Sequence, residues 1–203
     1  MLQLQWLACL LAMADCAALS APTFVQPQQR LTQRCPADAR MVACDIAITG
    51  INSRQISASI VIARPVREVW AILTDYDNLS QYVPNLVVSR REPAPNGKIR
   101  VFQEGAQNLA GFDFRASLTM EMVEKLPQHR LEFSCYRSFM FDKFSGKWQL
   151  SALPGDRTGL SYTVTVTPKG PVPVVAIEWR IREDVPLNLQ AIKLEAESRP
   201  RSR

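Results

Sequence analysis

Few residues in this chain have both the type and the spacing that catalysis requires. The one histidine, His129, follows Pro127 and Gln128 in an expected turn, where an exposed side chain lacks the buried partner that a general base needs. Cys135 lies on the apolar side of an expected strand, and no base stands beside it in the sequence to activate a nucleophile. Cysteines in such positions commonly act as small core residues. The sequence therefore predicts no catalytic residue.

Metal binding has equally little support in the sequence. Asp75 and Asp77 offer fewer oxygen ligands than a hard cation takes, and they suit the end of one helix and the start of the next turn. The cysteines include no CxxC pair; they are Cys9, Cys16, Cys35, Cys44 and Cys135. Cys35 and Cys44 could form a disulfide if the protein is exported. We predict neither a metal site nor a cofactor.

Two polar residues share the apolar side of expected strands. If Ile99 and Val101 point inward, so does Gln103, because alternate residues of a strand face the same side. Tyr162 has the inward parity of the last strand. A buried polar group without a partner costs about 1–3 kcal/mol. Each side chain is therefore a satisfied core group, a residue at a sheet edge, or one that binds a ligand carbonyl or hydroxyl.

The elements that would position these residues are mostly strands. From Leu86 the apolar residues recur with period two, and Pro- and Gly-containing turns separate the segments. Short sequential turns favour an antiparallel meander. A short amphipathic helix, about 66–74, begins after Pro65. The expected strands are 42–48, 55–63, 86–92, 98–105, 112–124, 129–137, 140–152 and 158–168.

The longest helical pattern covers 172–197 at the end of the chain. Its apolar residues recur at steps of three or four: Val174, Ile177, Ile181, Val185, Leu189, Ile192 and Ala196. This stripe is the obvious cover for the apolar face of the strands. Pro186 removes one backbone hydrogen bond, so a kink or a break is expected there.

Charge and composition limit the function classes. The net charge of +5 is spread thinly, without the dense basic patch and interleaved aromatics of a nucleic-acid-binding protein. Apolar residues 2–21 are interrupted by Asp15, which makes a membrane span unfavourable and leaves a targeting segment or an unstructured extension open. We divide the chain into an N-terminal segment and linker (1–40), a domain (41–197) and a basic tail (198–203).

The order and spacing of these elements are similar to those of a known family. Over about residues 41–197 the chain resembles the coenzyme-Q-binding START-domain and polyketide cyclase/dehydrase group of the START-like superfamily, in the version found in cyanobacteria and chloroplasts. The residues that carry the resemblance are Pro65, Leu73-Thr74-Asp75-Tyr76, Val83-Pro84-Asn85, Gly146-Lys147-Trp148 and Arg182-Glu183-Asp184-Val185-Pro186.

The resemblance implies an α+β helix-grip fold. A curved antiparallel sheet of six to seven strands would wrap on the long C-terminal helix and leave a tunnel between them. Members of the superfamily bind lipids, quinones, polyketides or hormones, and a minority are enzymes. With the strand parities, this indicates ten residues as ligand contacts: Gln103, Phe114, Leu118, Met120, Phe133, Trp148, Tyr162, Ile177, Ile181 and Val185.

The leading hypothesis is a carrier or chaperone that binds a quinone, isoprenoid or lipid in this tunnel. The first alternative is a cyclase or dehydratase acting on a polyketide-like substrate. Such an enzyme needs a positioned acid or base, and the expected strands carry no inward-facing histidine or carboxylate. The second is a partner-binding protein with a solid core. The resemblance favours a cytoplasmic or chloroplast-stroma location, with export by an N-terminal signal left open. Peripheral membrane contact near Gly170 to Val175 is a further possibility.

Overall fold

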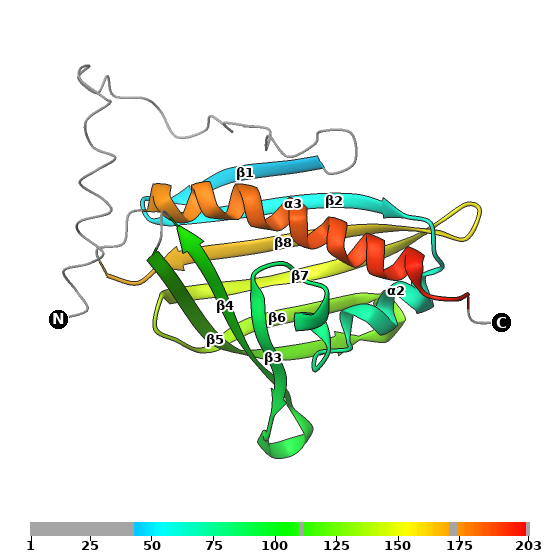
Figure 1. Ribbon diagram of the computed structural model, residues 1–203, viewed down its shortest axis with the longest axis horizontal. Coiled ribbons are helices and arrows are strands. Elements are labelled where there is room, and N and C mark those ends of the chain that lie inside the picture. The colour runs from blue at the N-terminus through cyan, green and yellow to red at the C-terminus, as the bar shows by residue number, and fades with distance from the viewer. Residues whose placement is uncertain (1–42, 110–111, 171–173, 202–203) are drawn as a thin grey trace.

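One antiparallel sheet, with its strands in the order β1-β2-β8-β7-β6-β5-β4-β3, forms the body of the protein (Figure 1). The computed structural model describes residues 43–109, 112–170 and 174–201. The strands within these residues are β1 (Ala43–Gly50), β2 (Ser53–Ile62), β3 (Leu86–Glu92), β4 (Ile99–Leu109), β5 (Phe112–Lys125), β6 (Arg130–Ser138), β7 (Phe141–Leu153) and β8 (Arg157–Pro168).

The strand count corrects the prediction of six to seven strands, since eight are present in the described residues. β1 is a full partner of β2, with Ile46 opposite Ile56. β3 forms the other edge by pairing with β4. Both edge strands are short compared with the central ones, and the resemblance alone did not predict that both would join the same sheet.

Alternating burial explains which side of the sheet meets the core. Along β2 every second side chain is buried, including Ile56 and Ile62. On β8 the same alternation buries Leu160, Val164 and Val166. These residues form the inner face, which lies toward the C-terminal helix, as the parity predicted. The opposite face of the sheet is not uniformly exposed, because Thr119 is buried and its hydroxyl donates to Glu92.

Within the described residues, two α-helices accompany the sheet. α2 (Val66–Leu73) confirms the predicted helix at 66–74 and buries Val69, Ile72 and Leu73. α3 (Val174–Ser198) crosses in front of the sheet and lies closest to β2, with further contacts to α2 and β8 (Figure 1). In the part of the chain that the structure describes, short 3₁₀ helices occupy three connections: η2 (Leu79–Gln81), η3 (Pro95–Gly97) and η4 (Leu126–Gln128).

We expected a kink or a break at Pro186; α3 runs through Pro186 as one helix, so the break does not occur. The residues on either side explain why. Val185 and Leu189 are buried in the core, so packing against the sheet holds the helix together where proline removes a backbone hydrogen bond.

The C-terminal end of α3 is joined to the β2–α2 connection by hydrogen bonds. The Arg64 guanidinium donates to the carbonyl oxygens of Ala196 (2.9 Å), Glu197 (2.6 Å) and Arg199 (2.8 Å). The Ala63 N–H donates to the Glu197 carboxylate at 2.7 Å. Arginine satisfies the terminal carbonyl groups that a helix leaves unpaired, so this end is a capped anchor.

The structure describes the C-terminal end of the predicted domain but not the segment before it. The predicted N-terminal segment, 1–40, lies outside the described residues, as does Cys35, so their roles stay predictions. In the predicted basic tail, Arg199 pairs with Glu195 (2.7 Å) and Asp75 (3.7 Å). The start of the tail is therefore attached to the domain.

Candidate functional site

Aromatic side chains gather on the inner face of β6, β7 and β8. Phe133 lies 5.7 Å from Phe144 and 5.8 Å from Tyr162 between ring centroids, and Trp148 lies 4.2 Å from Tyr162. We call Phe133, Phe144, Trp148 and Tyr162 the inner aromatic cluster. Phe133 is buried, whereas the other three are only partly buried although they face the core side. The cluster therefore presents apolar surface that the protein itself does not fully cover.

Strand register brings the cluster together. Phe133 pairs with Gly146, and Trp148 pairs with Tyr162, so the two rows are adjacent on one face. A Cβ on Gly146 would lie 2.7 Å from Cζ of Phe133 and 2.0 Å from the carbonyl oxygen of Thr163. Only glycine fits here, and its missing side chain lets the Phe133 ring lie across β7.

Tyr162 supplies a hydroxyl group to the cluster. No hydrogen-bond partner for its hydroxyl is found among the residues that the structure describes. Burial raises the pKa of Tyr162 above its usual range, so the hydroxyl stays protonated at physiological pH. A neutral hydroxyl in an apolar setting is a hydrogen-bond donor available to a ligand oxygen.

Gln103 faces inward as predicted, but its amide has a protein partner. Its Nε2 donates to Oγ of Ser89 at 3.3 Å, and that hydroxyl donates to the carbonyl oxygen of Tyr76 at 2.5 Å. These hydrogen bonds agree with the expectation that Gln103 is a satisfied core group. A ligand contact through Gln103 stays a prediction.

The other predicted contacts are distributed over the core. Met120 and Val185 are buried in the hydrophobic core, and Leu118 is partly buried against it. The side chains of Phe114, Ile177 and Ile181 lie outside what the structure describes. The structure thus brings together Phe133, Trp148 and Tyr162 of the predicted set. It adds Phe144, whose inward parity was visible in the sequence.

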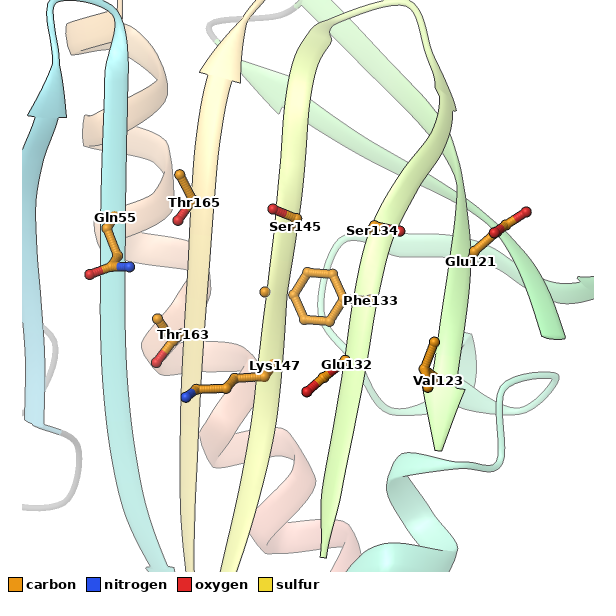
Figure 2. Close-up of a pocket in the computed structure, with 11 residues that line it drawn as sticks. Gln55, Glu121, Val123, Glu132, Phe133, Ser134, Ser145, Lys147, Thr163 and Thr165 are labelled. Atoms are coloured by element: carbon orange, nitrogen blue, oxygen red, sulfur yellow. The ribbon is translucent and has the colours of Figure 1, made fainter. Parts of the chain in front are cut away.

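The outer face of the sheet carries a separate hollow of about 400 Å³. Its lining is mostly polar and comes from β2 and β5 to β8: Gln55, Glu121, Val123, Glu132, Phe133, Ser134, Ser145, Gly146, Lys147, Thr163 and Thr165. Figure 2 shows these side chains along neighbouring strands, with the Phe133 ring among them. This hollow is not the predicted tunnel, which would lie on the other side of the sheet.

Ion pairs fix the charge of the carboxylates in the outer hollow. Hydrogen bonds from Arg100 (2.9 Å) and Lys98 (3.0 Å) hold the pKa of Glu121 below its usual range. A hydrogen bond from Lys125 (2.7 Å) lowers the pKa of Glu132. Both groups stay ionised near neutrality, so neither has the raised pKa of a general acid.

The surroundings of His129, Cys135, Asp75 and Asp77 do not favour a catalytic or metal-binding role. His129 is exposed in a left-handed turn conformation. Burial raises the pKa of the Cys135 thiol, which disfavours the reactive thiolate. The Asp75 carboxylate accepts a bond from Asn78, and the Asp77 carboxylate accepts the N–H of Arg91 at 2.7 Å. Within residues 43–109, 112–170 and 174–201, no three His, Cys, Asp or Glu side chains cluster in a way that could hold a metal ion.

None of the helices in the described part of the chain is both long enough and apolar enough to cross a membrane.

A curved antiparallel sheet with a long C-terminal helix and an aromatic inner face defines the class of this domain. The chain belongs to the polyketide cyclase / dehydrase and lipid transport family, whose model matches residues 62–193. Among curated proteins, none matches the chain significantly. The predicted superfamily is therefore confirmed, and the coenzyme-Q-binding branch stays a prediction.

Solved structures share the fold at low sequence identity. The Zhui aromatase/cyclase from Streptomyces sp. R1128 is 18% identical with a TM-score of 0.65, over 74% of this chain and 97% of that chain. A STAR-related lipid transfer protein fragment from Xanthomonas axonopodis is 14% identical with a TM-score of 0.65, over 79% and 96%. Human STARD10 is 9% identical with a TM-score of 0.60, over 78% and 70%. These likenesses establish the START-like helix-grip fold.

Proposed function

We propose that this protein binds an apolar, oxygen-bearing small molecule between α3 and the inner face of the sheet, as a carrier or chaperone. The observation that carries the proposal is the inner aromatic cluster, in which Trp148 and Tyr162 face the core side yet stay partly exposed. A site of this composition binds mainly by burial, at about 2.5 kcal/mol for each roughly 100 Å² of apolar ligand surface.

The Tyr162 hydroxyl narrows the ligand class. One hydrogen bond contributes about 1 kcal/mol, which orients a ligand more than it holds it. Because the hydroxyl is protonated, it suits a carbonyl or hydroxyl oxygen at the end of an apolar body. A quinone, an isoprenoid or a lipid has this character. The expected cytoplasmic or plastid location belongs to the same proposal.

The relatives support the same ligand chemistry. The family description includes lipid transport, and one structural neighbour is named as a lipid transfer protein. Both descriptions name lipids, which are apolar ligands.

A direct test compares a quinone with its hydrocarbon counterpart. Binding of 1,4-naphthoquinone and of naphthalene is measured by calorimetry on the purified full chain. We expect Trp148→Ala to weaken both ligands. Tyr162→Phe should weaken naphthoquinone by about fivefold and leave naphthalene unchanged, because only the quinone accepts a hydrogen bond.

The matched control is Tyr136→Phe, since Tyr136 is 52% exposed, away from the cluster. Organic-solvent extraction followed by mass spectrometry should also recover an apolar molecule with the protein. If neither ligand binds and no apolar molecule is recovered, the binding proposal is wrong.

A cyclase or dehydratase is the second candidate, and the Tyr162 hydroxyl is the observation that favours it. A protonated donor in a water-poor site can polarise a substrate carbonyl as well as bind one. The two functions differ in what happens to the bound molecule. A carrier releases a poly-β-ketone substrate analogue unchanged, whereas a cyclase releases a cyclised product, and chromatography of the incubated mixture separates these outcomes.

A further inference from the structure

Two turns at one end of the sheet expose large apolar side chains. Ile51 in the β1–β2 turn is 95% exposed and Phe139 in the β6–β7 turn is 88% exposed, the highest fractions among the large apolar residues that the structure describes. Strand register places Arg54 opposite Val166 and Phe141 opposite Pro168. Both turns therefore flank the C-terminal end of β8, at the end of the sheet where α3 begins (Figure 1).

Side-chain hydrogen bonds hold both turns in shape. Arg54 Nη1 donates to the carbonyl oxygens of Gly50 (3.3 Å) and Ser53 (3.0 Å). Oγ of Ser138 accepts the N–H groups of Met140 (3.1 Å) and Phe141 (3.2 Å). Because the backbone of each turn is fixed in this way, Ile51 and Phe139 are held outward instead of folding back on the domain.

The charged side chains around these turns are mostly basic. Residues 48–54, 137–143 and 166–170 contain Arg54, Arg137, Lys143 and Lys169 against a single acidic residue, Asp142. Lys143 and Lys169 are exposed, and neither forms an ion pair with another residue in the described part of the chain. The Lys169 backbone N–H donates to the Met140 carbonyl oxygen at 2.8 Å, which ties its position to the β6–β7 turn.

We propose that this end of the protein, defined by Ile51, Phe139, Lys143 and Lys169, docks on the surface of a membrane that contains anionic phospholipids. Ile51 and Phe139 insert among the lipid headgroups and upper acyl chains, where aromatic and aliphatic side chains gain apolar contact. Lys143 and Lys169 lie at headgroup level and are attracted by the anionic surface. We call these four residues the docking end.

The spacing of the two apolar side chains favours a lipid surface over a folded partner. The β1–β2 and β6–β7 turns are three strand positions apart, which is about 14 Å at the usual strand spacing. Two separate tips with lysines nearby do not make the continuous apolar core of a protein interface. A fluid interface accepts each tip independently.

Docking at this end also fits the proposed function, on which this further step rests. α3 begins at the same end, so an apolar ligand that left the inner face there would enter the lipid phase directly. The docking itself does not depend on a bound ligand.

Sedimentation of the full chain with vesicles tests the proposal. We expect the wild-type protein to partition onto phosphatidylcholine vesicles that contain phosphatidylserine, more weakly at high salt. The Ile51→Ser/Phe139→Ser double variant should reduce the partition coefficient at least about tenfold, through lost apolar insertion. The Lys143→Gln/Lys169→Gln variant should reduce it about tenfold on anionic vesicles and leave weak binding to pure phosphatidylcholine unchanged.

Leu126→Ser/Leu194→Ser is the matched control, because these leucines are 58% and 66% exposed but lie away from the docking end. It should partition like the wild type. Absence of wild-type binding, or equal binding by the Ile51→Ser/Phe139→Ser variant, would overturn the proposal. So would a wild-type dimer that this variant converts to a monomer, since the tips would then be a self-association surface. Naphthoquinone binding without vesicles should be the same in all these variants, which separates a failure of docking from a failure of ligand binding.

Discussion

The two ends of the sheet are built in contrasting ways. At one end the last turn of α3 is capped by Arg64 and joined to the β2–α2 connection through Glu197. At the other end the hairpin turns carry Ile51 and Phe139 into solvent. The difference indicates a division of labour: the anchored end holds α3 against the sheet, and the docking end meets the surroundings. Substitutions should therefore affect stability at the first end and binding at the second.

The largest expected effect is at Arg64. Arg64→Ala removes three hydrogen bonds to the last carbonyl groups of α3 and an ion pair with Glu68. We expect the free energy of unfolding to fall by about 2–4 kcal/mol, because hydrogen bonds from charged groups are the stronger class. Urea unfolding measures this. Arg157→Ala is the control, since Arg157 donates to one carbonyl oxygen in an exposed turn. An equal loss in both variants would contradict the anchor.

Glu197 should give a pH-dependent effect at the same end. Burial alone would raise its pKa, but hydrogen bonds from Lys193 and the Ala63 N–H outweigh it and hold the pKa below the usual range. Its stabilisation is therefore present above the ordinary pKa of glutamate and is lost as the pH falls through the lowered value. Glu197→Gln should cost about 1–2 kcal/mol near neutrality.

The measurement that checks Glu197 is thermal or urea unfolding at a series of pH values. The difference between wild type and Glu197→Gln should shrink as the pH is lowered below the ordinary glutamate range. A difference that stays constant down to strongly acidic pH would show that the charge of Glu197 does not carry the stabilisation.

Ser138 should have a smaller effect at the docking end. Ser138→Ala removes the acceptor for the N–H groups of Met140 and Phe141. We expect a loss of about 1 kcal/mol in the free energy of unfolding, and faster amide hydrogen exchange confined to the β6–β7 turn. Ser151→Ala, on an exposed position of β7, is the control and should change neither quantity.

The smallest effect on stability should be at Ile51. Ile51 is 95% exposed, so Ile51→Ser removes almost no buried apolar surface and should change the free energy of unfolding by less than about 0.5 kcal/mol. The contrasting variant is Ile56→Val on β2. This fully buried side chain loses one methylene group, which should lower the free energy of unfolding by about 1 kcal/mol. A large loss of stability in Ile51→Ser would mean that the tip packs on the domain.

Period-two patterning predicted much of the sheet from local residues. Strand β3 was predicted at its observed bounds, and the parities of Phe133, Trp148 and Tyr162 placed them correctly on the inner face. These features depend on alternation along one strand, which the sequence displays directly. The helix at Val66 was likewise visible from Pro65 and its apolar spacing.

Features that depend on distant neighbours were not visible in the same way. The break expected at Pro186 does not occur, because the packing of Val185 and Leu189 on the sheet outweighs a local preference. Burial of Thr119 depends on Glu92, a partner from another strand. That Ile51 and Phe139 lie at the same end of the sheet depends on the strand order. Side-chain pairing across the sheet follows from register, and register is a property of the whole fold.

The ring of Phe133 packs over the backbone of Gly146, where β7 carries no side chain. Because Gly146 has no side chain, this one ring contributes both to the inner aromatic cluster and to the lining of the outer hollow. The two faces of the protein are therefore not insulated from each other at this point. A ligand that displaced the Phe133 ring on the inner face would therefore also change the lining of the outer hollow.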